Sequence, residues 1–287
     1  MRTTIDKFYD QETLRKLQLL QLELLKKFIS ICEKYKIQYF AVYGTLLGTV
    51  RHKGIIPWDD DIDVAMLRRD YEKFLEVAPK ELGNDFSIIN ADISLEYPFM
   101  TTRFMKKNTD FRTKSLKNIK CELGIFLDIF CYDNLPSNVK KQNIMFAKCY
   151  IYEKLYVLRH IRVPNLPYYG LKRAIVILLC NLGYIGVKLI PKKFLYTQCK
   201  KNSTKYMNEA SDEYCYTFSL EPKKLVISKQ ELFPLKKLPF EDIDICVPNR
   251  YHEILTRRYG NYMLPPPEGK RSYIIPYSLD FGEDINE

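Results

Sequence analysis

Glycine is scarce in this sequence, at 11 of 287 residues, and tryptophan occurs only once. So few glycines disfavour the glycine-rich dinucleotide-binding folds, whose phosphate loops need several of them. The eight cysteines include no C-x-x-C pair, which argues against a structural zinc site and favours unpaired thiols in a reducing compartment. Repeats of fixed period and low-complexity tracts are missing. The hydrophobic fraction of 46% and the charged fraction of 28% instead indicate a globular protein.

Acidic residues are in the minority, because 35 Asp and Glu stand against 45 Lys and Arg and the net charge is +10. This balance favours an anionic partner, such as nucleic acid, a nucleotide or phosphate substrate, or an acidic membrane face. The sequence lacks a K/R-rich aromatic run typical of RNA-binding proteins, so we expect no nucleic-acid partner. The N-terminal residues also lack the apolar stretch of a secretory signal, and we expect a cytoplasmic protein.

The order of the expected elements predicts an α+β fold with a mixed β-sheet core and a mainly helical insert. Helices are expected over residues 11–34, 45–53, 69–77 and 250–258 and through most of 137–207, and strands over 39–43, 62–66, 86–90, 99–106, 124–130, 214–219, 225–228 and 238–247. We therefore expect a catalytic core in residues 1–135, a helical insert in 136–210, and a closing α+β segment in 211–287 that completes the core.

The clearest chemical signal is an acidic run formed by Asp59, Asp60, Asp61 and Asp63. Four carboxylates this close repel one another unless a cation or water screens them. Acidic runs are usually solvated turns, but apolar residues flank this one on both sides. On an extended strand Asp61 and Asp63 share a face with Ile62 buried behind them, which makes a natural Mg²⁺ or Mn²⁺ clamp. Asp59 and Asp60 are interpreted as loop residues that support the site.

A second signal lies upstream, where an apolar strand ends at Gly44 and Thr45 is expected to cap a short helix. Free N–H groups and a hydroxyl at such a turn suit a phosphate, and Arg51 on the same helix could reach a second phosphate oxygen. Alone, this pattern is more often a plain helix cap. Followed by the paired aspartates, it predicts a nucleotidyltransferase-like fold.

That fold predicts a third carboxylate on a neighbouring strand, and Asp128 in GIFLDIF is an isolated acid in an apolar run. A lone buried carboxylate is costly unless it is paired or binds metal. We therefore group Asp128 with Asp61 and Asp63 as catalytic residues and metal ligands. Asp133 is predicted to be a turn residue, and Asp242 and Asp244 to lie on the polar face of a strand.

Four segments in this order resemble the LicD family of phosphocholine transferases: YGTLLGTVRHKGIIPWDDDIDVAM, RFMKKNT, GIFLDIF and YGNYMLPPPEGKR. The resemblance implies transfer of a phospho-alcohol from a CDP-activated donor, most often CDP-choline, to a sugar of a cell-surface polysaccharide or its lipid-linked precursor. By position, Asp61, Asp63 and Asp128 match the family's metal and catalytic acids. The phosphate-facing turn is matched by Gly44, Thr45 and Arg51. Arg103 matches a basic residue before the N-T pair.

The sequence departs from the family in two places. Cys131 stands where the family often has proline, and Tyr273 lies where many members carry histidine. Three other readings stay open at this point: a nucleotidyltransferase that attacks the α-phosphate of a nucleoside triphosphate, a glycosyltransferase with a D-x-D metal site, and a binding protein without catalysis.

Residues 168–193 form an apolar segment with Lys172 and Arg173 before it and Lys188, Lys192 and Lys193 after it. An apolar helix too short to span, flanked by aromatic and basic residues, suits the headgroup plane of a membrane. We expect peripheral contact with the inner membrane face here, and the alternative is a buried helix of the insert.

Overall fold

The structure is a computed structural model that describes residues 10–163, 170–267, 271 and 276–282. The first predicted helix forms with the expected bounds, because leucines at helical spacing turn one face into the core and the Asp10 carboxylate accepts a hydrogen bond from Thr13 N at 2.6 Å. All eight cysteines are unpaired, as predicted.

The described residues contain the following helices and strands. The helices are α1 (Gln11–Lys34), α2 (Tyr43–His52), α3 (Arg68–Val77), α4 (Val139–His160), α5 (Gly170–Val187), α6 (Lys192–Ser203), α7 (Lys229–Leu232) and α8 (Tyr251–Tyr259). The strands are β1 (Phe40–Ala41), β2 (Asp63–Leu67), β3 (Phe86–Ile89), β4 (Thr102–Lys106), β5 (Asp110–Thr113), β6 (Phe126–Asn134), β7 (Glu213–Cys215), β8 (Ile227–Ser228), β9 (Lys236–Phe240), β10 (Ile243–Val247) and β11 (Pro276–Asp280).

A mixed sheet of order β1-β2-β6-β4-β3 forms the centre of the molecule, and β7 and β8 extend it from the end of β6. β2 and β6 are parallel, whereas the other pairs are antiparallel. β5 pairs with β11, and β9 pairs with β10. Helices and a mixed sheet in one body confirm the predicted α+β class.

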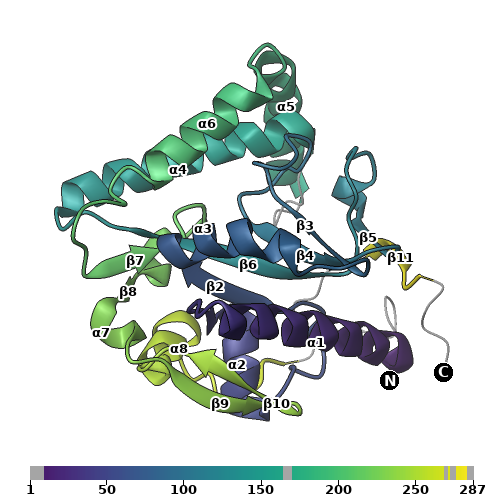
Figure 1. The fold of residues 1–287 in the computed structure, drawn as a ribbon. Coiled ribbons are helices and arrows are strands. Elements are labelled where there is room, and N and C mark those ends of the chain that lie inside the picture. The colour runs from purple at the N-terminus through teal and green to yellow at the C-terminus, as the bar shows by residue number, and fades with distance from the viewer. Residues whose placement is uncertain (1–9, 164–169, 268–270, 272–275, 283–287) are drawn as a thin grey trace.

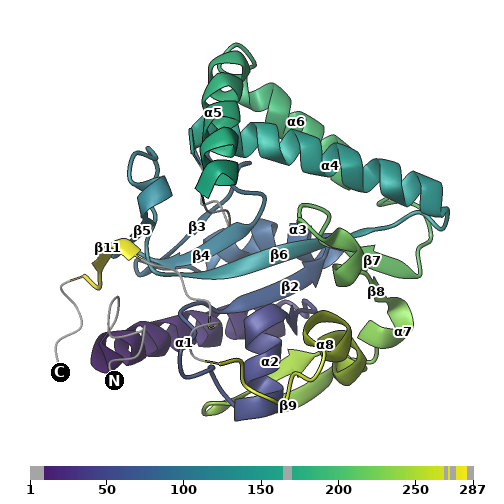
Figure 2. The ribbon, with the colours of Figure 1, turned by 180° about the vertical axis from the view of Figure 1, so that it is seen from behind.

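Alternation along the central strands sends their side chains to two different faces. Figures 1 and 2 show α1 and α3 on one face of the sheet and α2 and α8 on the other. Val64 and Ile129 pack in the core with Phe28 of α1 and Phe74 of α3, whose rings lie 5.1 Å apart. The residues that alternate with them, including Asp63 and Asp128, therefore point to the face that carries α2 and α8.

Several predicted elements are wrong in detail. Helix α2 begins at Tyr43 after the N-cap residue Val42, so Thr45 lies inside the first turn and does not cap it. The run 238–247 is a hairpin of two strands rather than one strand. The sequence reading missed β5 and β11, because each is a short strand that pairs with a distant segment.

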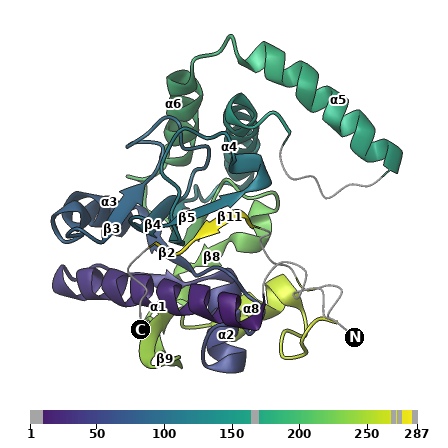
Figure 3. The same ribbon diagram turned by 90° about the vertical axis from the view of Figure 1, so that its right-hand side faces the viewer.

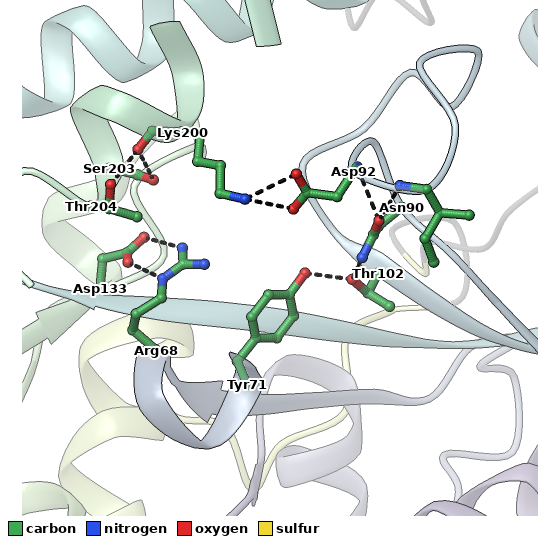
Figure 4. Close-up of polar contacts among 10 residues, drawn as sticks. Arg68, Tyr71, Asn90, Asp92, Thr102, Asp133, Lys200, Ser203 and Thr204 are labelled. Carbon is green, nitrogen blue, oxygen red and sulfur yellow. Dashed lines mark hydrogen bonds and ion pairs between the residues drawn. The ribbon is translucent and has the colours of Figure 1, made fainter. Parts of the chain in front are cut away.

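Asp133 is not a turn residue, as the sequence reading predicted, but a buried residue of β6. Its carboxylate accepts hydrogen bonds from Arg68 Nε at 2.7 Å and Nη2 at 3.0 Å. Figure 4 shows this pair beside a second one that joins Lys200 of α6 to Asp92. The two ion pairs fasten α3 to the sheet and α6 to the loop after β3.

Helices α4, α5 and α6 follow one another between β6 and β7 and lie on one side of the sheet (Figures 1 and 3). Val187 is the only buried residue of α5, so the alternative of a buried helix is wrong. Within the described chain, α5 is also the one helix long and apolar enough to cross a membrane by length and composition, so the expectation of a helix too short to span is wrong on length alone.

Candidate active site

Three of the predicted site residues form a row across neighbouring strands. Asp63 is the register partner of Asp128 in the parallel pair β2–β6, and Arg103 is the partner of Asp128 in the antiparallel pair β4–β6. The Asp128 N–H also donates to Ile62 O at 3.0 Å, which fixes this register at the start of β6. The sheet therefore places one cation beside two carboxylates, although they come from three separate parts of the chain.

Arg103 and Asp128 form an ion pair with a Nε–Oδ1 distance of 3.4 Å, and both side chains are at most 16% exposed. The Arg103 guanidinium lies 3.5 Å above the centre of the Phe126 ring, which holds it in place. Within the described residues, Nε of Arg103 and Oδ1 of Asp128 face each other without forming a hydrogen bond, and Nη1 of Arg103 is buried without a hydrogen-bond partner. Buried polar atoms are nearly always bonded, so these atoms point to a ligand.

Asp59, Asp60 and Asp61 form the tightest carboxylate group, with ligand oxygens all within 4.8 Å of one another. Among the described residues, this is the group whose carboxylate oxygens lie close enough together to hold one metal ion. It shares only Asp61 with the predicted ligands Asp61, Asp63 and Asp128. Asp61 also precedes β2 rather than lying on it. The two acids interpreted as supporting loop residues thus stand at the centre of the acidic cluster.

Two buried glutamines of α1 fix the backbone of this acidic loop. Gln18 Nε2 donates to Asp59 O at 2.9 Å, and Gln21 Nε2 donates to Asp60 O at 2.8 Å. Their amides satisfy loop carbonyls that would otherwise be buried without a donor. The sequence reading missed both residues, although their place on the apolar face of an amphipathic helix was a signal of a buried polar contact.

The buried carboxylates of this cluster carry more negative charge than the nearby arginines offset, and their pKa values are raised as a result. Burial and the Asp128 charge raise the pKa of Asp61 to about 6, against the opposing effect of Arg103. Burial, followed by the charges of Asp61 and Asp128, raises the pKa of Asp63 well above its usual range. Burial likewise raises the pKa of Asp128. Carboxylates in this state favour a proton or a cation.

Helix α2 packs directly against the acidic segment through Gly44 and Thr45 in its first turn. Thr45 Oγ1 accepts a hydrogen bond from Asp63 N at 2.8 Å, so this hydroxyl ties α2 to the start of β2. A Cβ atom on Gly44 would lie 2.4 Å from Asp59 Oδ2, and only glycine lets the helix come so close to that carboxylate. Both residues lie beside the acidic segment, and their predicted role in binding phosphate stays a prediction.

Arg51 lies on the same helix but in its last turn, where Nη1 donates to Tyr262 O at 2.9 Å. Its guanidinium lies 5.8 Å from the centre of the Trp58 ring, and that of Arg271 lies 4.0 Å from the same ring. Arg51 and Trp58 belong to the first segment that resembles the family, and Arg271 ends the last one. These two segments, far apart in sequence, therefore meet at the Trp58 ring. Tyr273, the substitute for the family histidine, lies outside the described residues.

Arg258 of α8 is a further cation that the sequence reading missed. Its guanidinium lies 4.3 Å from the centre of the Tyr43 ring, and its charge lowers the pKa of Asp63 against the effect of burial. No motif marks Arg258, because only the fold brings α8 to the carboxyl-bearing face.

The residues present fit a hard divalent cation. The donors are all carboxylate oxygens, which Mg²⁺ and Mn²⁺ prefer, and one of them, Asp128 Oδ1, is buried and accepts no hydrogen bond in the described chain, with the Arg103 guanidinium beside it. A cation beside Asp61 would also relieve the repulsion that raises the pKa values of the group.

Comparison with known proteins agrees with the motifs. The family described as LicD/FKTN/FKRP, nucleotidyltransferase domain, matches residues 36–161, which include every predicted site residue. Lipopolysaccharide cholinephosphotransferase LicD of Haemophilus influenzae is 33% identical over 271 residues, or 92% of this chain and 96% of that protein. The chain belongs to the LicD family. An uncharacterised protein of Rickettsia typhi is 43% identical over 63 residues, 21% of this chain and 20% of its own length.

Membership of the LicD family makes this chain a phosphotransferase of that type, as the motifs predicted. The structure also explains the family's N-T pair, here Asn108 and Thr109. Thr109 Oγ1 donates to Lys106 O at 2.8 Å and accepts from Ile125 N at 2.9 Å. This threonine therefore fixes the approach to β6, and with it the position of Asp128.

Proposed function

We propose that this LicD-family enzyme transfers phosphocholine from CDP-choline to a sugar hydroxyl of a lipopolysaccharide or its lipid-linked precursor, in a Mg²⁺-dependent reaction. The observation that carries the proposal is the row of Asp63, Asp128 and Arg103, in which Arg103 and Asp128 form an ion pair whose buried atoms leave hydrogen bonds unmade within the described chain. The name of the Haemophilus influenzae relative supports choline phosphate and lipopolysaccharide as the substrates.

Asp61 would be the central ligand for Mg²⁺, because it belongs both to the close group with Asp59 and Asp60 and to the trio with Asp63 and Asp128. Bound there, the ion would neutralise charge on the donor diphosphate. Arg103 would donate an N–H of Nη1, which makes no hydrogen bond in the described chain, to a phosphate oxygen, while its Nε faces Asp128. Arg258 and Arg51 would add positive charge at the edges of the site.

In the proposed reaction, the sugar oxygen forms a bond to the phosphorus that carries choline, and the bond from that phosphorus to CMP breaks. Asp128 accepts the proton of the sugar hydroxyl and later passes it to water. The raised pKa of the Asp128 carboxyl makes it a stronger base than an exposed aspartate, which suits this role. CMP leaves with the electron pair of the broken bond.

Aromatic side chains lie on the same face of the sheet as Asp128. Phe130 is two residues further along β6, and its ring packs edge-on against Tyr43 at 4.9 Å and Tyr216 at 5.0 Å. Quaternary ammonium groups bind well against such rings. This row of three rings supports choline over an uncharged alcohol as the transferred group.

Donor selection tests the proposal. The enzyme would be incubated with Mg²⁺, a lipopolysaccharide acceptor and, in turn, CDP-choline, CDP-glycerol, a UDP-sugar and a nucleoside triphosphate, and nucleotide release would be measured. We expect CMP release from CDP-choline and none from Asp61→Asn under the same conditions. Turnover of the triphosphate with pyrophosphate release, or of the UDP-sugar, would overturn the proposal in favour of a nucleotidyltransferase or a glycosyltransferase.

A further inference from the structure

Helix α5 carries a continuous apolar stripe that the protein does not cover. Five aliphatic side chains of α5 at spacings of four and three residues are each 50–77% exposed, namely Leu171, Ile175, Leu178, Leu182 and Ile185, and Leu189 just after the helix is 87% exposed. At 3.6 residues per turn this spacing puts them on one side of the helix. Exposed apolar stripes of this length mark interaction surfaces in folded proteins.

The opposite side of α5 is attached to the protein. Asn181 Oδ1 accepts a hydrogen bond from Arg162 Nε at 2.5 Å, and Val187 is buried beside Tyr156 and Leu195. A Cβ atom on Gly183 would lie 3.0 Å from Leu158 of α4, so the two helices approach closely there. Helix α5 lies at the outer edge of the helical segment in Figure 3, and the exposed fractions of its stripe show that these side chains face solvent.

The segment that contains α5 is basic, although three of its lysines, Lys154, Lys192 and Lys200, form ion pairs with acids outside the segment. Residues 154–208 contain no Asp or Glu, although the rest of the chain is rich in them, and they carry eleven basic residues: Lys154, Arg159, Arg162, Lys172, Arg173, Lys188, Lys192, Lys193, Lys200, Lys201 and Lys205. Cations that bracket an apolar stripe are complementary to a surface that is apolar inside and anionic at its rim. An anionic lipid membrane has both properties.

We propose that α5 docks this protein on an anionic membrane surface, with the stripe from Leu171 to Leu189 in the headgroup region and the flanking cations on lipid phosphates. The helix lies in the plane of the membrane instead of crossing it. Lys172 and Arg173 occupy its first turn, and the uncharged part, residues 174–187, is about 21 Å long. The hydrocarbon core is about 30 Å thick, and α5 is attached to α4 along one side.

A second copy of the chain fits the stripe less well than a membrane. Two copies packed through α5 would bring two acid-free basic segments together, and their like charges would repel. The proposal concerns lipid alone and does not depend on the proposed reaction.

Vesicle flotation tests the proposal with the full-length protein. Vesicles of phosphatidylglycerol and phosphatidylcholine would be compared with phosphatidylcholine alone, without any donor or acceptor. We expect the wild type to float with the anionic vesicles at low salt and to be released as salt rises. Leu178→Glu/Leu182→Glu and Arg173→Glu/Lys193→Glu are each expected to lower the bound fraction at least about tenfold.

Two control variants carry the same chemical changes outside α5. Ile144→Glu/Ile151→Glu alters two exposed aliphatic residues of α4, and Lys140→Glu/Lys141→Glu reverses two exposed charges at its start. Both are expected to float like the wild type. If an α5 variant unfolds by circular dichroism, the milder Leu178→Gln/Leu182→Gln replaces it.

Three outcomes would overturn the proposal. The first is folded wild-type protein that stays in the soluble fraction with anionic vesicles at low salt. The second is an equal loss of binding in the control variants. The third is a wild-type dimer that the α5 variants turn into a monomer in sedimentation without any flotation, since the stripe would then be covered by a second copy.

Discussion

Asp63 and Asp128 stand opposite each other on the parallel strands β2 and β6, and both point to the face that carries α2 and α8. Their backbones cannot separate without breaking the centre of the sheet. The two carboxylates are therefore held side by side, and burial and mutual repulsion raise the pKa of Asp63. Among the described residues, Arg103 is the buried counter-ion next to Asp128, and Arg258 of α8 adds an opposing charge at Asp63.

This arrangement predicts different effects for the two acids. Asp63→Asn and Asp128→Asn should each lower turnover at least about 100-fold. Asp63→Asn should leave the melting temperature unchanged or higher, because it removes a like charge from a buried cluster. Asp128→Asn should be about 1–3 kcal/mol less stable than Asp63→Asn, since the buried Arg103 loses its partner.

Thermal unfolding of both purified variants without metal measures this difference. A Tm for Asp63→Asn well below that of Asp128→Asn would contradict the pairing of Arg103 with Asp128.

A local motif led the sequence analysis to this region, although it treated Asp59 and Asp60 as supporting residues and the roles of the acids stay predictions. Asp61, Asp63 and Gly44 lie in one continuous segment whose turn and strand signals are short-range. Arg258 reaches the site only through tertiary packing, so no local pattern marks it. Gln21 has a local signal in its place on the apolar face of α1, but only the fold shows that it meets the Asp60 carbonyl. The same limit explains the missed strands β5 and β11, whose partners are more than a hundred residues away.

Local signals also misled at two positions. Thr45 has the residue type of a helix cap, but α2 starts two residues earlier and the hydroxyl binds the backbone of Asp63 instead. Asp133 follows an apolar run as a turn residue would. It continues β6 because Arg68, from a different element, neutralises it in the core.

Trp58 is the sole tryptophan of the chain and directly precedes Asp59, so its fluorescence reports on the acidic cluster. We predict that Mn²⁺, which is paramagnetic, quenches Trp58 in a saturable way and that Mg²⁺ competes with it. Asp61→Asn should weaken this binding at least about tenfold, because charged carboxylates bind such ions best. Equal quenching of wild type and Asp61→Asn would contradict the role of Asp61 as a ligand.

Gln21 is predicted to position the acidic loop without touching substrate. Gln21→Leu leaves the buried Asp60 carbonyl without its donor, which should cost about 1–3 kcal/mol and weaken Mn²⁺ binding in the same fluorescence titration. Gln11→Leu makes the same change at an exposed position of α1 and should alter neither quantity. If Gln21→Leu is less stable yet binds Mn²⁺ normally, the glutamine serves the fold alone.

We predict that removing one partner of the buried Arg68–Asp133 ion pair lowers stability strongly, whereas replacing both residues by apolar ones costs little. Arg68→Met leaves a buried carboxylate without a counter-ion and should cost about 3–5 kcal/mol in urea unfolding. Arg68→Met/Asp133→Leu should recover most of that loss. Lys200→Met, which breaks the half-exposed pair with Asp92 shown in Figure 4, should cost less than about 1 kcal/mol. Equal losses in all three variants would contradict this account.

The fate of each donor phosphate tests the proposed reaction most directly. CDP-choline labelled with ³²P in the phosphate next to choline would be incubated with the enzyme, Mg²⁺ and lipopolysaccharide, and the products separated. The account predicts that the label enters the lipopolysaccharide while unlabelled CMP is released, and that Asp128→Asn transfers none. Label that remains in a nucleotide product, or choline transferred without the label, would show that a different bond breaks and would contradict the account.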